Sequence, residues 1–321
     1  MTARFTRRPS ARRRLAAAGA IAVTGALLLT GCGDQTDDAD GGSGDGGKEG
    51  AKGTKSSEAP LFSELPKEIQ DAGVIRVGSD IAYPPIEFFD DKELKGVDPG
   101  IAEALSEQLG VKLEFKDAGF DQLIIGLNKS GKYDIVMSAM TDTKERQDGA
   151  AEDEAGGVDF VDYFKAGSAL LVEKGNPKKI ESLDDLCGLG VAAQRGTANE
   201  TLVNEQNKKC GDDKIDFFIA DKDTDSVTQL QNGRVQVVVT DYPVAIYSAE
   251  TAGGGDRFEV VGDQIDAAPY GIAVHKDNTQ LRDAIQKALQ AIMDNGEYAK
   301  VLKEWGAEAG ALEQATVNAG K

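Results

Sequence analysis

Histidine and cysteine are scarce in this chain of 321 residues, which holds one histidine and three cysteines. A Ser-His-Asp triad or a histidine-rich metal site is therefore hard to build, because each of them needs imidazole groups. The single histidine, His275, follows a strand-like apolar run and is interpreted as an ordinary residue at a strand edge. The sequence also lacks a glycine-rich loop followed by Lys and Ser or Thr, the signature of a phosphate-binding loop. We expect no catalytic residue, no metal and no cofactor.

Basic residues are fewer than acidic ones. The chain has 36 Lys and Arg against 55 Asp and Glu, which gives a formal net charge of -19. This balance argues against binding to nucleic acid, which relies on the neutralisation of phosphate groups. Apolar residues make up 40% of the chain and charged residues 28%, which is typical of a soluble globular protein and not of a multi-span membrane protein. The length suffices for one large or two ordinary domains.

The first 31 residues have a composition of their own. Six arginines before residue 15 precede an apolar stretch over 15–30, which predicts a secretion signal too short for a comfortable membrane span. The stretch ends in Leu29-Thr30-Gly31-Cys32 and resembles the lipobox of bacterial lipoproteins. That resemblance implies cleavage of a signal peptide over 1–31 and a diacylglycerol group on Cys32. The basic start is compatible with Sec export and with twin-arginine export.

A polar stretch rich in Gly, Asp, Ser and Lys follows over 33–60 and cannot bury enough apolar surface to fold. We interpret residues 32–65 as a flexible tether, so the protein is predicted to be exported and anchored by lipid at the outer face of the cell membrane. With Cys32 carrying the lipid, Cys187 and Cys210 remain, and the exported setting predicts a disulfide between them. A pair of buried thiols is the alternative at this point.

Short apolar runs alternate with helical patterns from residue 74 onward, which predicts an α/β fold with mostly parallel strands. The second α/β unit is interpreted as an insertion in the first. Residues 66–168 and 271–312 are then lobe 1, residues 169–270 are lobe 2, and residues 313–321 are a tail. Two crossover strands, near 168–172 and 271–275, would join the lobes. Ligands in such architectures often lie between the domains.

The stretch from Ser138 to Arg146 follows an apolar run that ends at Met137 and indicates a short buried strand. Ser138 and Thr141 come at the carboxyl end of that strand, and Thr143 is placed to cap a helical turn. Arg146 lies one turn further on, where its side chain can return toward the strand end. Hydroxyls, free backbone N–H groups and a guanidinium together indicate a carboxylate receptor. The alternative is a strand-to-helix loop with a surface arginine.

Four pieces of the sequence, in this order, resemble the polar amino-acid branch (family 3) of the extracellular solute-binding proteins of ABC importers: 78–88, 131–135, 140–146 and 194–197. The resemblance extends over about residues 70–308. It implies a two-lobed periplasmic-binding-protein-like fold, with a ligand cleft between lobes that two crossover strands join. It also implies a receptor that closes by a hinge around a polar amino acid, basic or amide, and delivers it to an ABC permease with its ATPase. We expect the receptor to be a monomer.

The same resemblance implies a carboxylate-binding group of side chains. Arg146 would clamp the α-carboxylate of the ligand, helped by Ser138 and Thr141. Thr197, at a predicted helix start in lobe 2, would bind the same carboxylate when the lobes close. Three neighbours complete this part of the predicted site: Ala139, Met140 and Ala198. Many relatives carry hydroxyls in place of the two alanines, so the identity of the ligand is open.

The remaining predicted contacts concern the rest of the ligand. Asp241, at a strand end, would accept the α-ammonium group, and Tyr83 and Phe120 would hold the ligand side chain between their rings. Asp80 would reach the polar tip of that side chain. A core position for either aromatic ring and a turn-capping role for Asp80 are the alternatives. Glu87 is interpreted as structural.

Two other functions remain open for this fold. A cyclohexadienyl dehydratase-like enzyme would need an acid/base group in the cleft, for which Asp80 and Asp241 are available. A sensory module would present the ligand to a membrane kinase. The lipobox and the tether favour a receptor, so we do not expect an enzyme.

Overall fold

The computed structural model describes residues 56–149 and 156–321 of the chain. The predicted signal peptide, the lipidation site Cys32 and most of the predicted tether lie outside these described residues. The described residues, 56–149 and 156–321, belong to one compact unit. Among the residues that the structure describes, no helix has the length and apolarity needed to cross a membrane.

The first part of the fold is an α/β unit in which strands and helices alternate as predicted. Its strands β1 and β4 pair in parallel, and so do β1 and β5. The elements in chain order are η1 Phe62–Glu64, α1 Lys67–Ala72, β1 Val74–Ser79, β2 Phe88–Asp90, β3 Glu93–Lys95, α2 Val97–Leu109, β4 Lys112–Asp117, η2 Phe120–Gln122, α3 Leu123–Asn128, β5 Ile135–Val136 and α4 Lys144–Asp148.

The second part begins with a long strand and returns to the first part through another. Its parallel pairs are β7 with β8 and β7 with β9. The elements are β6 Val158–Glu173, η3 Leu183–Leu186, β7 Gly190–Gln194, α5 Ala198–Lys209, β8 Asp216–Ala220, α6 Asp223–Gln231, β9 Val237–Asp241, α7 Tyr242–Thr251, η4 Ala252–Gly254, β10 Phe258–His275, α8 Thr279–Asn295, α9 Glu297–Glu304, η5 Glu308–Gly310 and β11 Thr316–Val317.

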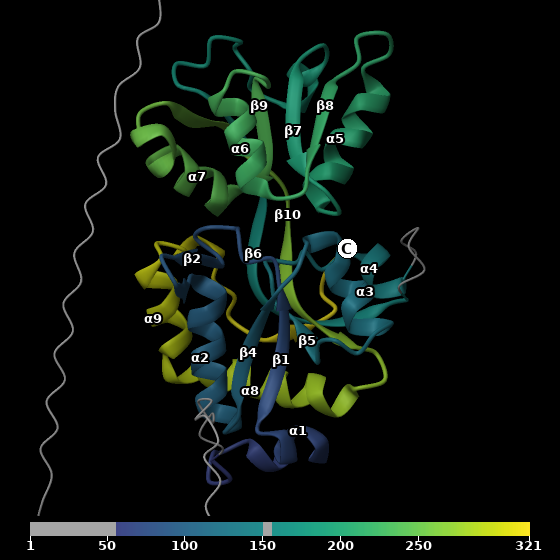
Figure 1. Cartoon of the computed structure of the whole chain (residues 1–321), viewed down its shortest axis with the longest axis vertical. Helices are drawn as coiled ribbons and strands as arrows, with labels where there is room; N and C mark the ends of the chain where they lie inside the picture. The colour runs from purple at the N-terminus through teal and green to yellow at the C-terminus, as the bar shows by residue number, and fades with distance from the viewer. Residues whose placement is uncertain (1–55, 150–155) are drawn as a thin grey trace, which may run out of the picture. The chain divides into compact units, whose positions relative to one another are not determined.

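The long strands β6 and β10 join two lobes. Lobe 1 contains β4, β1 and β5, in the lower half of Figure 1, and lobe 2 contains β9, β7 and β8, in the upper half. β6 and β10 pair with each other in antiparallel fashion, with register shifts between Val261 and Gly271. Their other neighbours differ at the two ends, since β10 pairs with β5 in lobe 1 and β6 pairs with β9 in lobe 2. Two strands thus carry the chain between the lobes, as the family resemblance implies.

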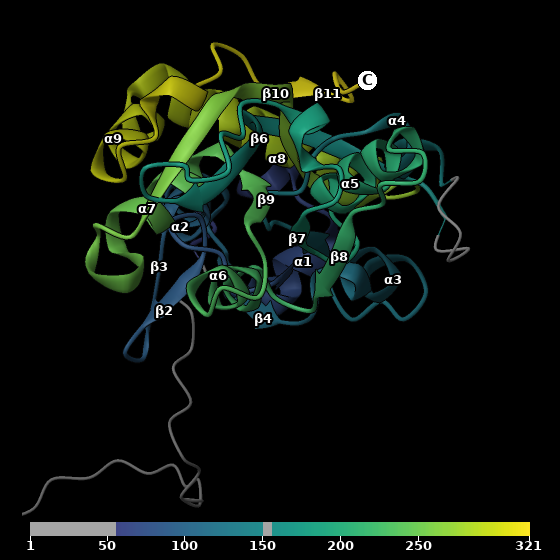
Figure 2. The same cartoon turned by 90° about the horizontal axis from the view of Figure 1, so that it is seen from above.

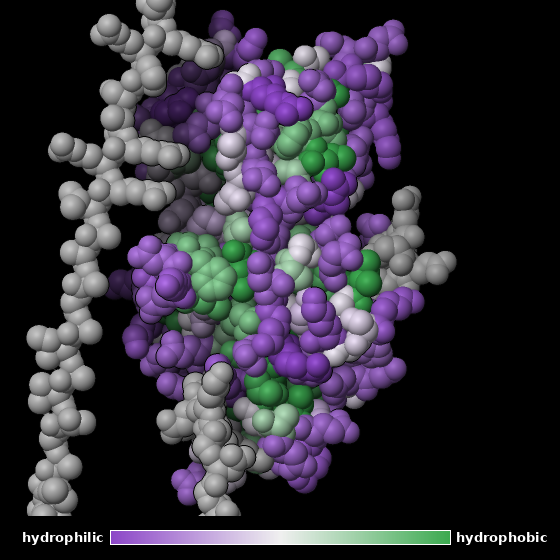
Figure 3. Space-filling model, in the orientation of Figure 1, coloured by the Kyte–Doolittle hydropathy of each residue, from purple (hydrophilic) through white to green (hydrophobic). Residues whose placement is uncertain are grey.

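Each lobe has its own apolar core. In lobe 1 the stripe of Leu281, Ile285, Leu289 and Ile292 on α8 is fully buried, as its helical spacing predicts. Lobe 2 has two clusters, one on each side of its sheet strands, around Leu170 and Leu171 respectively. Hydrophilic side chains cover most of the face seen in Figure 3, in agreement with the charged composition of the chain.

The start of α2 differs from the local pattern. Asp98 followed by a proline is typical of a helix cap, yet the helix begins at Val97 with Gly96 as its N-cap. Asp98 is buried, and its carboxylate accepts hydrogen bonds from Tyr163 Oη at 2.7 Å and from the Ala139 N–H at 3.2 Å. The carboxylate therefore holds the stretch 138–146 in place instead of capping its own helix.

The C-terminal segment docks on lobe 1. β11 pairs with β6 in antiparallel fashion, and the chain end lies beside it in Figure 2. Asp162 accepts hydrogen bonds from Thr316 Oγ1 at 2.8 Å and from the Ala319 N–H at 3.1 Å. Asp142, next to Thr141 of the predicted site, accepts one from the Gly320 N–H at 2.7 Å. The segment thereby supplies hydrogen-bond donors to one oxygen of each of two buried carboxylates.

Removal of residues 316–321 is expected to lower the thermal unfolding midpoint by several degrees, because Asp142 and Asp162 would lose buried hydrogen-bond donors. Each such loss costs on the order of 1–3 kcal/mol, and 1 kcal/mol corresponds to about 2–4 °C in a protein of this size. Gly320→Ala should act in the same direction, since a Cβ there would meet the Asp142 carbonyl oxygen at 2.0 Å. Differential scanning calorimetry measures the unfolding midpoints. Ala319→Ser, at an exposed position of the same segment, is the control. Unchanged midpoints in both variants would contradict it.

Candidate functional site

The stretch from Ser138 to Arg146 links β5 to α4 and is held from several sides. Ser138 Oγ accepts a hydrogen bond from the Asp80 N–H at 3.0 Å and donates one to Glu87. The predicted cap is confirmed: Thr143 Oγ1 accepts a hydrogen bond from the Arg146 N–H at 3.3 Å. The short helix α4 therefore starts where the sequence places it, and it carries Arg146 back toward the end of β5.

Arg146 lies between the two lobes. Its Nη1 donates to the Thr141 carbonyl oxygen at 2.7 Å, and its Nη2 donates across the cleft to the Gly196 carbonyl oxygen at 2.9 Å. The guanidinium stands over the ring of Phe120, with 5.4 Å between its carbon and the ring centroid. Burial lowers the pKa of Arg146 to about 10, opposed by the nearby Asp241. The side chain therefore remains a cation at neutral pH, and a cation attracts anionic groups.

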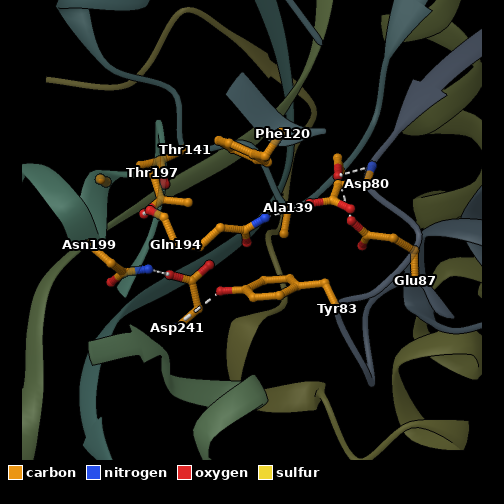
Figure 4. Close-up of a pocket in the computed structure, with 12 residues that line it drawn as sticks. Asp80, Tyr83, Glu87, Phe120, Ala139, Thr141, Gln194, Thr197, Asn199 and Asp241 are labelled. Atoms are coloured by element: carbon orange, nitrogen blue, oxygen red, sulfur yellow. Dashed lines mark hydrogen bonds between the residues drawn. The ribbon is translucent and has the colours of Figure 1, made fainter. Parts of the chain in front are cut away.

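Asp241 is a buried carboxylate of lobe 2. It ends β9, and its carboxylate accepts hydrogen bonds from Tyr270 Oη at 2.6 Å and from Asn199 Nδ2 at 2.9 Å. Burial raises the pKa of Asp241, while the hydrogen bond from Tyr270 works in the opposite direction. Its backbone N–H donates to Tyr83 Oη at 3.2 Å, so an aromatic side chain of lobe 1 reaches it across the cleft. Figure 4 shows Tyr83 and Asn199 on opposite sides of this carboxylate.

Asp80 is a buried carboxylate of lobe 1 that faces lobe 2, directly after β1. Its carboxylate accepts hydrogen bonds from two side chains of lobe 2, Gln194 and Lys222, the latter at 3.0 Å. Burial raises the pKa of Asp80, and the hydrogen bond from Lys222 lowers it. The turn-capping alternative for Asp80 does not describe these contacts, because both partners come from the other lobe.

A narrow pocket between the lobes brings most of the predicted residues together (Figure 4). The predicted residues that line it are Asp80, Tyr83, Phe120, Ser138, Ala139, Thr141, Thr197, Ala198 and Asp241. Arg146 lies beside it and lines an adjoining cavity with Phe120. Met140 lines that adjoining cavity too, but its side chain is buried within a core cluster. Thr197 caps α5, because its Oγ1 accepts a hydrogen bond from the Glu200 N–H at 3.1 Å.

Three lining residues were not among the predicted contacts: Glu87, Gln194 and Asn199. Gln194 belongs to the family-like piece 194–197, and Asn199 follows the Thr197 cap, so the sequence offered a signal for both. Glu87 is fully buried, and its pKa is raised well above the usual range by burial and by the nearby Asp98. In the described part of the chain, no group of three or more His, Cys, Asp or Glu side chains is arranged to hold a metal ion.

The chain is similar to known proteins over most of its described part. A family model described as bacterial extracellular solute-binding proteins, family 3, matches residues 75–308. The arginine-binding protein ArgT of Corynebacterium glutamicum is 31% identical over 259 residues, which cover 79% of this chain and 81% of ArgT.

Several solved structures are also similar to this chain. An ancestral arginine-binding protein bound to arginine is 38% identical, with a TM-score of 0.66 over 73% of this chain and 98% of that one. An ancestral arginine-binding protein bound to glutamine is 37% identical, with a TM-score of 0.65 over 74% and 99% of the two chains. The ancestral amino-acid-binding protein AncCDT-1, a precursor of cyclohexadienyl dehydratase, is 34% identical, with a TM-score of 0.65 over 74% and 97%.

Proposed function

The chain belongs to the bacterial extracellular solute-binding proteins, family 3, and we propose that it captures a polar amino acid, with arginine as the first candidate, for an ABC importer. The observation that carries this proposal is the pairing of a cation and an anion on opposite walls of one cleft. Arg146 comes from lobe 1 and Asp241 from lobe 2, and each lies in the electrostatic field of the other. A zwitterion matches this pair, because its carboxylate faces the guanidinium and its ammonium faces the carboxylate.

A basic side chain on the ligand fits the remaining part of the pocket. Asp80 supplies a carboxylate to the lining of the pocket, and Tyr83 and Phe120 supply aromatic faces that attract cations. The names of ArgT and of the ancestral arginine-binding protein support the same class of ligand. Amide side chains remain the second class, since the carboxylate of Asp80 also accepts hydrogen bonds from neutral donors.

Capture would work by closure of the two lobes about β6 and β10. Polar bridges between the lobes include Arg146 with Gly196 and Tyr83 with Thr240, whose side-chain oxygens lie 3.1 Å apart. An aromatic contact adds to them, because the Phe88 ring of lobe 1 lies 6.0 Å from the Tyr247 ring of lobe 2. A ligand that touches both lobes would stabilise the closed arrangement by its differential affinity for it.

The setting of this activity follows from the N-terminal sequence and from the family. We propose that a diacylglycerol group on Cys32 anchors the protein at the outer face of the cell membrane, with residues 32–65 as the tether. The folded part would then hand its ligand, as a monomer, to a permease driven by a cytoplasmic ATPase.

A thermal-shift screen of residues 60–321 tests the proposal against amino acids, polyamines, opines, peptides and sugars. Binding to the folded state raises stability by about 2.7 kcal/mol at a ligand concentration of 100 times Kd. We expect arginine or another polar amino acid to give the largest shift. Shifts with sugars or peptides alone would overturn the amino-acid assignment. Turnover of prephenate or arogenate would indicate a dehydratase instead.

A further inference from the structure

Lys222 is a cation that contacts Asp80, one of the residues lining the pocket, and neither the family resemblance nor the sequence pattern assigns it a role. It precedes α6 in lobe 2, and its Nζ lies 3.0 Å from Asp80 Oδ1 and 3.7 Å from Asp117 Oδ1, both in lobe 1. Its side chain is 39% exposed, so the long stem keeps room to move. One ammonium group therefore stands between two carboxylates on the opposite lobe.

The two carboxylates are different in kind. The Asp80 side chain is 5% exposed and lines the pocket, whereas the Asp117 side chain is 52% exposed and stands outside it. Asp117 is held in place, because its Oδ1 accepts a hydrogen bond from the Ile81 N–H at 3.1 Å. Lys222 can therefore exchange a buried partner for an exposed one by a small movement of its ammonium group.

The charges of the pocket make this exchange relevant to the choice between cationic and neutral ligand side chains. The zwitterionic head of an amino acid is matched by Arg146 and Asp241, which leaves Asp80 as the anion for the ligand side chain. Lys222 already pairs with Asp80, since its Nζ lies 3.0 Å from Asp80 Oδ1, and this hydrogen bond opposes the rise that burial causes in the Asp80 pKa. A cationic ligand tip must displace Lys222 from Asp80, whereas a neutral tip meets a carboxylate that is already paired.

We propose that Lys222 is an exchangeable counterion that sets the selectivity of the pocket between cationic and neutral side chains. With a cationic ligand, Asp80 binds the ligand and Lys222 moves to Asp117. With a neutral hydrogen-bonding ligand, Lys222 stays on Asp80 and keeps the buried carboxylate compensated. The pocket thus accepts both classes of ligand, and Lys222 reduces its preference for cationic over neutral side chains. This inference rests on the proposed function, in which Asp80 faces the ligand side chain.

Arginine and citrulline provide the test, because they have nearly the same shape and differ in the charge of the side-chain tip. Their dissociation constants are measured by isothermal titration calorimetry on residues 60–321 of the wild type and of Lys222→Met. The variant is expected to raise the ratio of the citrulline Kd to the arginine Kd by tenfold or more, because Asp80 then needs a cation from the ligand. Asp117→Asn should lower the ratio, because Lys222 loses its second partner.

Lys116→Met is the matched control. It removes a lysine charge from the residue before Asp117, where Lys116 pairs with Glu114 at 2.9 Å, and it should leave the ratio within twofold of the wild type. Thermal unfolding without ligand confirms that each variant is folded. A wild type that binds arginine, with a ratio that Lys222→Met leaves unchanged, overturns the role of Lys222 and leaves the proposed function standing. A folded wild type that binds neither arginine nor citrulline, nor any other polar amino acid in the thermal-shift screen, overturns the proposed function itself.

Discussion

Replacement of Arg146 by alanine is expected to weaken binding of the amino-acid ligand by about 2–5 kcal/mol, which corresponds to a roughly 30- to 4,000-fold higher Kd. The ligand carboxylate would lose a charge-assisted partner. The pocket would also lose the bonds from Arg146 to the carbonyl oxygens of Thr141 and Gly196, of which the second joins the lobes. Isothermal titration calorimetry on residues 60–321 measures the change directly.

Two further variants separate the carboxylate role from a general effect of charge. Arg146→Lys keeps the charge but not the planar fork, so its affinity should fall between those of the wild type and Arg146→Ala. Arg195→Ala removes the same charge close by, from a side chain that is 47% exposed and paired with the exposed Asp221, and it should bind almost as well as the wild type. If Arg146→Ala binds the ligand as tightly as the wild type, the assignment of the carboxylate to Arg146 is wrong.

Loss of the disulfide between Cys187 and Cys210 is expected to lower the free energy of unfolding by about 3 kcal/mol. The two cysteines are bonded in the structure, as the sequence analysis predicts, with a sequence separation of 23 and a Cα–Cα distance of 5.4 Å. The bond joins the end of η3 to the end of α5 and so restricts the unfolded chain over that span. Denaturant unfolding of a double variant, Cys187→Ala with Cys210→Ala, measures the effect.

Ligand affinity is the control for this prediction. Neither cysteine lines the pocket, so the double variant should bind the ligand with nearly the wild-type Kd at a temperature where it is folded. Reduction of the wild type should bring its unfolding midpoint down to that of the variant. The three samples to compare are the oxidised wild type, the reduced wild type and the double variant. If their unfolding curves coincide, the bond contributes nothing to stability.

Local patterns were enough to predict most elements and one part of the site. The spacing of Leu281, Ile285 and Leu289 predicts α8, because a buried helix face repeats with the turn of the helix itself. The Thr143 cap and the return of Arg146 toward β5 are equally local, since they depend on residues within one helical turn. Where the governing interaction spans a few residues, the sequence alone contains the information.

The sequence by itself therefore determined the order of the elements and the α/β class. It also predicted a carboxylate receptor at 138–146, and its family-like pieces pointed to both walls of the cleft. Only the tertiary structure decided which polar groups meet inside it. Tyr270 reaches Asp241, and Lys222 reaches Asp80, from positions 29 and 142 residues away. Asp98 does not cap its own helix. Its carboxylate accepts a hydrogen bond from the N–H of Ala139, 41 residues further along the chain. The reason is physical: a buried charge binds whichever donor the fold brings to it, and its free energy depends on that distant partner.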